Sequence, residues 1–315
     1  MKILLITTLY PAFLNQSKIK VSYAVHFFAK QWTKNHEVQV IRLWPSYPGF
    51  LKLFSKVRES KKYDFEESFM LEEVNVRRIP INKIPKIDYR NNDINAVAEK
   101  IIGSIRNIPD VIICDILNPS IYVGEIVARE FNSKLIASLH NSDISYLSKE
   151  KNYKKYIKTD YNVNKIVFRS SKVEKYFKEI YKGPKNESDF KKILFGIEKK
   201  DIVDQDKLNR KISESKKIIL TASSLKKLKN VDVLIKAFTM IKNRNGYVLK
   251  IIGDGPERKR LEGIVDELNC RELIFFEGEK SRKEVLNNME ESEIFVMVSS
   301  PETFGLVYIE AMAKG

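Results

Sequence analysis

Short apolar segments alternate with amphipathic segments along most of the 315 residues, and this alternation limits what the chain can fold into. The apolar segments have the length of buried strands, and the amphipathic segments have the 3.6-residue period of helices. Such alternation is typical of α/β domains in which helices cover both faces of a mostly parallel sheet. A polar, charged stretch at 199–216 interrupts it. The sequence therefore predicts two doubly wound domains, at 1–198 and 217–315, joined by a linker.

The predicted elements divide between the two domains. In the first, strands are expected at 2–8, 37–43, 74–79, 109–114, 134–139, 166–168 and 192–195, and helices at 21–34, 94–106, 121–131 and 171–181. In the second, strands are expected at 217–222, 247–252, 273–276 and 294–298, and helices at 231–242, 256–268, 282–290 and 304–314.

Composition places the chain among folded globular proteins, because 43% of its residues are hydrophobic and 10% are aromatic. The two cysteines, Cys114 and Cys270, are far apart and lie beside apolar runs, which favours buried free thiols over a disulfide. The apolar start, residues 1–6, is too short for a signal peptide. No apolar run approaches the roughly 20 residues that span a bilayer. We therefore expect a cytoplasmic protein that meets a membrane only at its face.

The formal net charge is +15, which indicates either a lysine-rich solvated surface or an anionic partner. No nucleic-acid-binding motif is present, so lipid or phosphate partners fit better. Residues 45–58 and 149–192 mix aromatic and basic side chains, as interfacial segments do. The alternative for both stretches is ordinary surface over an aromatic core.

The last fifteen residues, 301–315, carry the strongest functional signal. Glu302 and Glu310 are eight positions apart around Phe304-Gly305-Leu306, after a predicted strand and at the start of a predicted helix. A strand, a tight turn and a helix start form an anion site, because free backbone N–H groups and the helix dipole point to one spot. Carboxylates beside such a site are suited to accept hydrogen bonds from sugar hydroxyls.

Two further predicted strand-to-helix turns contain candidate functional residues. Gly253-Asp254-Gly255-Pro256 permits a tight turn, with Pro256 suited to the first helical position, although any such turn favours these residues. His140 follows the predicted strand 134–139, where a histidine is either structural or turned toward a cleft. His26 and His36 are better explained as structural residues.

These features together resemble the retaining glycosyltransferases of the GT-B fold, glycosyltransferase family 4 in particular. The resemblance rests on the Glu302-x7-Glu310 spacing, the glycine turn at 253–256 and Lys229 after the first strand of the second domain. It implies an α/β GT-B architecture, with two Rossmann-like doubly wound domains facing a central cleft. The first domain would bind the acceptor, and the second the nucleotide-sugar. The family continues beyond Gly315, which implies a truncated chain with an incomplete second domain.

The resemblance also implies roles for single residues. In the family the first glutamate contacts the donor hexose, the second contacts the ribose, and a lysine neutralises the diphosphate. An arginine usual before Leu225 is Ser224 here, so Lys226 or Lys227 is an alternative phosphate ligand, and solvated lysines are the plainer interpretation. We assign His140 and Glu302 as catalytic, and as donor-binding we assign Lys229, Gly253, Gly255, Phe304, Gly305, Leu306 and Glu310.

The predicted function is transfer of a hexose from a nucleoside diphosphate sugar to a hydroxyl of a glycan or lipid-linked acceptor, in surface polysaccharide or glycolipid synthesis. We expect no metal and no cofactor besides the donor, and we interpret Asp204-Gln205-Asp206 as part of the linker. We expect no nucleic acid partner, and an anionic membrane surface, the inner face of the plasma membrane, as a further partner. The alternatives are a nucleotide-sugar 2-epimerase of the same fold and an inactive fragment.

Overall fold

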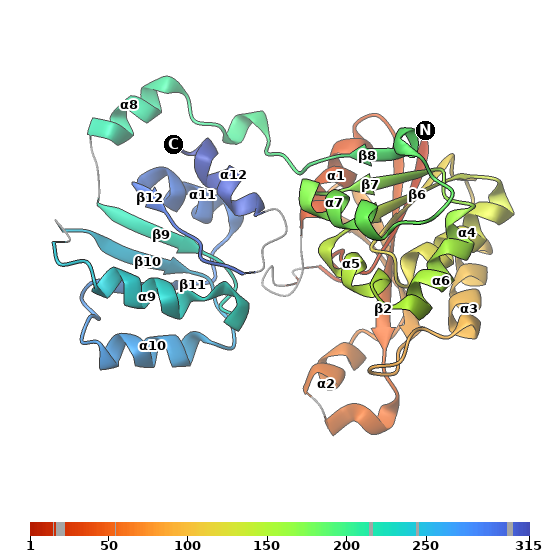
Figure 1. Cartoon of the computed structure of the whole chain (residues 1–315), viewed down its shortest axis with the longest axis horizontal. Helices are drawn as coiled ribbons and strands as arrows, with labels where there is room; N and C mark the ends of the chain where they lie inside the picture. The colour runs from red at the N-terminus through yellow and green to blue at the C-terminus, as the bar shows by residue number, and fades with distance from the viewer. Residues whose placement is uncertain (15, 17–22, 54, 214–216, 244–245, 301–304) are drawn as a thin grey trace. The chain divides into compact units, whose positions relative to one another are not determined.

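The computed structural model describes residues 1–14, 16, 23–53, 55–213, 217–243, 246–300 and 305–315 (Figure 1). The chain divides into two compact units, Met1–Leu194 and Phe195–Gly315. Each unit contains a largely parallel sheet with helices against it, which confirms the predicted α/β class.

The sheet of the first unit has eight strands in the order β3-β4-β2-β1-β5-β6-β7-β8. All neighbours are parallel except β3 and β4. The strands are β1 (Lys2–Thr7), β2 (Glu37–Ser46), β3 (Glu67–Leu71), β4 (Val74–Asn82), β5 (Val111–Asp115), β6 (Lys134–Leu139), β7 (Lys165–Phe168) and β8 (Phe190–Lys192).

Both faces of this sheet are buried, and the alternation of side chains along β1 shows how. Leu4 and Ile6 belong to one apolar cluster, which also holds side chains of helices α3 and α4, whereas Ile3 and Leu5 belong to another cluster with α1. Successive strand residues point to opposite faces, so a strand covered on both sides is apolar throughout. The helices are α1 (Ala24–Thr33), α2 (Ser55–Lys61), α3 (Asn91–Ile102), α4 (Ser120–Phe131), α5 (Asn141–Leu147), α6 (Glu150–Asp160) and α7 (Ser171–Ile180).

The second unit has a four-stranded parallel sheet in the order β11-β10-β9-β12. Helices α9 and α10 lie against one face, and α11 and α12 lie on the other (Figure 1). Its elements are β9 (Ile218–Ala222), β10 (Val248–Ile252), β11 (Ile274–Gly278), β12 (Ile294–Phe295), α8 (Gln205–Ser213), α9 (Val231–Thr239), α10 (Arg258–Glu267), α11 (Arg282–Glu291) and α12 (Leu306–Ala313).

Strand order locates the edge of each sheet where a ligand is expected. In the first unit the chain builds outward from β1 on both sides, through β2 and through β5, so the order reverses between β1 and β5. In the second unit the reversal lies between β9 and β12. Open α/β sheets bind ligands outside the carboxyl ends of strands at such a switch point.

Most predicted elements are confirmed within a few residues, and the differences have physical causes. β3, α2, α5 and α6 were not predicted, and the segment expected as a linker, 199–216, contains helix α8. In α6 only Tyr156 and Asp160 are buried, and α8 buries none of its residues, so neither carries a strong apolar stripe. Helix α10 begins at Arg258, after Pro256 rather than at it, and the last predicted strand of the first unit lies at 190–192 instead of 192–195.

The expectation for the cysteines is confirmed, since Cys114 and Cys270 are buried free thiols. Burial raises the pKa of the Cys114 thiol well above its usual range. Among the described residues, no helix combines the length and the apolar character that a bilayer crossing requires.

Candidate active site

In the second unit, two loops touch at the carboxyl ends of β9 and β10. The amide of Ser223 donates to the carbonyl of Ile252 over 3.0 Å, and the amide of Leu225 donates to the carbonyl of Asp254 over 2.9 Å. Gly253 has a φ of 128°, and a Cβ there would lie 1.9 Å from the carbonyl oxygen of Ser223. Only glycine permits that approach. A Cβ on Gly255 would likewise lie 2.4 Å from the carbonyl oxygen of Leu225.

Lys229 lies at the switch point of this unit. It ends a short 3-10 helix, Lys227–Lys229, that follows β9, and its Nζ is 3.5 Å from Oγ of Ser299 in the segment after β12. The next residue, Asn230, adopts a left-handed conformation and donates from Nδ2 to the carbonyl of Val298 over 3.1 Å. The half-buried Lys229 is thus held against the β12 loop, whereas Lys226 is exposed.

Glu310 lies in the second turn of α12, as predicted, and the structure gives it a partner that the sequence did not indicate. Its Oε1 accepts a hydrogen bond from Nε of Arg282, the first residue of α11, over 3.0 Å. Arg282 also donates from Nη2 to Oδ2 of Asp201 over 2.8 Å. Burial of Arg282 works against its charge, but the two carboxylates outweigh burial and raise the pKa of its guanidinium.

The predicted loop before α12 is described only in part. Gly305 is the N-cap of α12, with a φ of 68°, and Leu306 is the first helical residue. Glu302 and Phe304 lie outside the described residues. Three of the predicted donor-binding residues, Lys229, Gly253 and Gly255, therefore lie in loops at the carboxyl ends of the strands. A fourth, Leu306, is the first residue of α12.

In the first unit, His140 follows β6 as predicted and is hydrogen-bonded to Asp115 at the end of β5. The atoms His140 Nε2 and Asp115 Oδ1 are 2.9 Å apart. Asp115 is fully buried, and the His140 side chain is 16% exposed. Asp143 in α5 accepts hydrogen bonds from the amides of His140, over 2.8 Å, and Leu117, over 3.0 Å. Two neighbouring strand ends thus build a histidine–carboxylate pair at the switch-point edge.

Asp115 and Arg282 are the site residues that sequence reasoning missed. The sequence did contain one signal for Asp115, which is an acidic residue directly after the predicted strand 109–114. That strand was predicted to be followed by a helix and then by a parallel strand that leads into His140. Parallel strands place their carboxyl ends at one edge, so the two side chains could have been paired. We find no comparable signal for Arg282.

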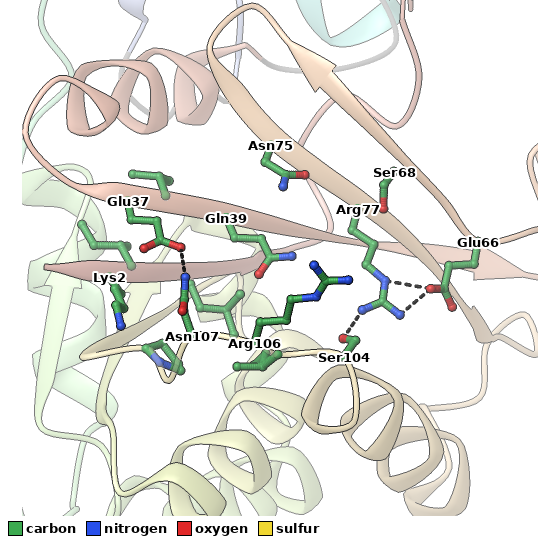
Figure 2. A pocket seen from close by; sticks show the side chains of 15 residues that line it. Lys2, Glu37, Gln39, Glu66, Ser68, Asn75, Arg77, Ser104, Arg106 and Asn107 are labelled. Carbon is green, nitrogen blue, oxygen red and sulfur yellow. Dashed lines mark hydrogen bonds and ion pairs between the residues drawn. The ribbon is translucent and has the colours of Figure 1, made fainter.

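A hollow of the first unit lies at the opposite edge of its sheet. This cleft of about 640 Å³ is lined by residues at or near the amino ends of β1, β2, β4 and β5, among them Lys2, Gln39 and Arg106 (Figure 2). Arg77 donates to Glu66, with its Nε 2.7 Å from Oε1, and also to Ser104. These internal pairs and the amino-edge position favour a structural role for the cleft.

The Asp204-Gln205-Asp206 run lies at the start of helix α8. Oδ1 of Asp204 accepts a hydrogen bond from the amide of Lys207 over 2.8 Å, as a residue at a helix start does. Within the described ranges, no group of three or more His, Cys, Asp or Glu side chains is arranged to hold a metal ion.

A protein family model matches the part of the chain that contains these loops. Residues 203–315 match the family model described as "Glycosyl transferases group 1". These residues therefore carry the sequence pattern of group 1 glycosyltransferases. Lys229, the glycine turn and Glu310 all lie inside the matched range, which begins just before helix α8.

The chain is also similar in sequence to curated glycosyltransferases. It is 28% identical over 186 residues to N-acetyl-alpha-D-glucosaminyl L-malate synthase from Bacillus anthracis, which covers 58% of this chain and 48% of that protein. It is 28% identical over 105 residues to alpha-monoglucosyldiacylglycerol synthase from Streptococcus pneumoniae, which covers 33% of this chain and 24% of that one. The matches thus span half or less of these relatives.

Solved structures show the fold. Sucrose-phosphate synthase from Thermosynechococcus elongatus matches with a TM-score of 0.69 at 17% identity, over 100% of this chain and 79% of that one. HepE from Anabaena, solved with UDP and glucose, matches with a TM-score of 0.61 at 17% identity, over 100% and 78%. These neighbours are GT-B glycosyltransferases, and the matches extend over 100% of this chain, so the chain has the GT-B fold.

Proposed function

We propose that this chain is a family-4-like retaining glycosyltransferase, which moves a hexose from a nucleoside diphosphate sugar to a hydroxyl of a glycan or lipid-linked acceptor. The observation that carries the proposal is the position of Lys229 beside Ser299, at the switch point between β9 and β12. A lysine ammonium there is a suitable point charge for a diphosphate. The glycine loop at 253–255 follows the neighbouring strand β10, and Gly253 and Gly255 present backbone without side chains.

The donor would occupy the carboxyl edge of the second unit. In this proposal Lys229 neutralises the diphosphate, the start of α12 at Gly305 and Leu306 supplies backbone N–H groups, and Glu310 accepts hydrogen bonds from the ribose. A carboxylate has about four lone-pair sites, so Glu310 can accept from Arg282 and from a ribose hydroxyl at the same time. Stabilisation of the leaving diphosphate by fixed charges would supply much of the rate, without a metal ion.

The hexose itself would meet His140 and Glu302, the two residues we propose as catalytic. Nε2 of His140 is bonded to the buried Asp115, and the side chain is 16% exposed, so the imidazole is both held in place and able to contact a substrate. UDP is the first nucleotide to test, because the neighbour from Anabaena was solved with UDP and with UDP-glucose. One relative is named for a diacylglycerol glycolipid, which supports a lipid-linked acceptor class.

The test is a panel of nucleoside diphosphate sugars read by thermal shift, followed by calorimetry on the ligands that stabilise the protein. A ligand at a hundred times its Kd should stabilise the chain by about 2.7 kcal/mol. Transfer is then assayed with the best donor and with diacylglycerol and glycan acceptors, and the anomeric configuration of the product is read by NMR. If no nucleoside diphosphate sugar shifts the melting temperature, the proposed function is wrong.

A further inference from the structure

We propose that Asp115 is a positioning residue for His140, whose imidazole it orients through Nε2. The proposal rests on the proposed function for the role of His140, but the pairing itself is tested separately below. Asp115 is 0% exposed, so its carboxylate reaches substrate only through the imidazole. Nε2 of His140 is 2.9 Å from Oδ1 of Asp115, and the His140 side chain also takes part in the capping box of α5 with Asp143.

The carboxylate of Asp115 is itself fixed by donors from two neighbouring strands. Oγ of Ser138, on β6, donates to Oδ1 over 2.9 Å, and Oγ1 of Thr7, on β1, donates to Oδ2 over 3.4 Å. Both donors are fully buried. A carboxylate held from two sides has little freedom to rotate, so the imidazole that it holds is pre-oriented before substrate arrives.

Arg169 extends this network from the end of β7. Its Nε donates to Oγ of Ser138 over 3.0 Å, and its Nη2 lies 4.0 Å from Oδ1 of Asp115. Only 3% of Arg169 is exposed. Asp115 therefore faces two cationic side chains, and a neutral residue in its place would leave them without their buried counter-charge.

The charged groups around His140 favour its protonated form. Burial works against the imidazolium, but attraction to Asp115 and, to a lesser degree, to Asp143 outweighs burial and the repulsion by Arg169, so the pKa of His140 is raised. In the same way burial opposes the Asp115 carboxylate, yet His140 and Arg169 hold its pKa below the usual value. A protonated imidazole is a charged donor, and a charged donor bonds a sugar or phosphate oxygen roughly twice as strongly as a neutral one.

The first experiment is an NMR titration of the histidine rings, of which the chain has three. The resonance of His140 is assigned from its loss in the variant His140→Gln. We expect a wild-type midpoint above the ordinary value of about 6.5. Asp115→Asn should lower that midpoint by about one unit or more, while Asp110→Asn, at the exposed amino end of the same strand, should leave it unchanged.

The wild-type titration tests the pairing even if the Asp115→Asn variant does not fold. If His140 in the wild-type protein titrates at or below the ordinary value, the pairing is refuted, whatever Asp115→Asn does. An unaltered midpoint in a folded Asp115→Asn protein refutes it equally. Neither measurement requires catalysis, so the pairing can stand even if the proposed transfer reaction is wrong.

The second experiment asks whether Asp115 acts through His140. Turnover is measured for Asp115→Asn, for His140→Gln and for the double variant. His140→Gln should lose about 10²- to 10³-fold in kcat if the imidazole stabilises developing charge. At a pH above both midpoints, Asp115→Asn should lose about tenfold for each unit by which the His140 midpoint falls, because the protonated fraction falls by that factor. In the His140→Gln background, Asp115→Asn should have no further effect, and an equal loss in both backgrounds would show a merely structural role.

Discussion

Arg282 and Glu310 form a hydrogen-bonded ion pair across helices α11 and α12, with Nε of Arg282 3.0 Å from Oε1 of Glu310. The pair is mostly buried, since the side chain of Glu310 is 14% exposed and that of Arg282 is 25% exposed. Arg282 also reaches Asp201, in the segment that leads into α8. The carboxylate proposed to bind ribose is therefore fixed in orientation before a donor arrives.

Replacing Glu310 by glutamine should weaken donor binding. Glutamine keeps the shape and one acceptor oxygen but loses the charge, so the affinity for UDP should fall by about 1–3 kcal/mol. Calorimetry with UDP measures this loss. Glu267→Gln, at the exposed carboxyl end of α10, is the matched control and should bind as wild type. Unchanged binding by Glu310→Gln would remove the ribose assignment.

Removing the ammonium of Lys229 should weaken binding of the nucleoside diphosphate but not of the nucleoside. Lys229→Ala should bind UDP more weakly and uridine as before, so the difference in affinity between the two ligands shrinks. Competition calorimetry with both ligands gives that difference. Lys242→Ala, exposed beyond the end of α9, should leave it unchanged. If Lys229→Ala also leaves it unchanged, then Lys226 or Lys227 holds the diphosphate, or the site lies elsewhere.

Two glycine substitutions in neighbouring elements should change stability in opposite directions. Gly253→Ala places a Cβ 1.9 Å from a backbone oxygen at a φ of 128°, and should destabilise the domain by about 1–3 kcal/mol or more. Gly263→Ala in α10 meets nothing within 4 Å, and should stabilise it by about 1 kcal/mol through helix propensity. Urea denaturation measures both. Equal effects would contradict the loop contact described above.

Stability should depend on pH through Asp143. Burial raises the pKa of this carboxyl from 3.8 to about 6, against the amide hydrogen bonds that lower it. The folded state then keeps a proton that the unfolded state releases, so this group's contribution falls as pH rises from about 3.8 to about 6. Asp143→Asn lacks this dependence. The free energy of unfolding of the wild type relative to the variant should therefore decline by about 1–3 kcal/mol across that window. A constant difference would refute the shift.

Membrane contact should depend on both charge and an exposed aromatic ring. Phe50 is 79% exposed on a short 3-10 helix, Gly49–Leu53, near the exposed Arg58 and Lys62. The chain should pellet with anionic vesicles at low salt and less at high salt, because surface attraction decays over a Debye length of roughly 8–10 Å. Phe50→Ser should reduce pelleting without loss of folding. Absence of pelleting at low salt would make a soluble acceptor the better proposal.

Local patterns were sufficient for much of the fold. Strand β6 was predicted with its observed bounds, and β1, β9 and β10 within one residue, because a continuous apolar run between polar turns is a local signal. Helices α6 and α8 and strand β3 escaped prediction, since their side chains are mostly polar or exposed. Such elements form because neighbouring parts of the chain hold them, and a pattern based on burial does not detect them.

Local residue patterns predict the α/β class, the glycine turn at 253–255, and the positions of Lys229 and His140 after their strands, because each depends on residues close together in the chain. What those residues touch depends on the tertiary structure. Asp115 meets His140 across 25 positions, and Arg282 meets Glu310 across 28. A parallel sheet requires a helix between neighbouring strands, so groups that share its carboxyl edge are always far apart in sequence, and their pairing depends on strand order.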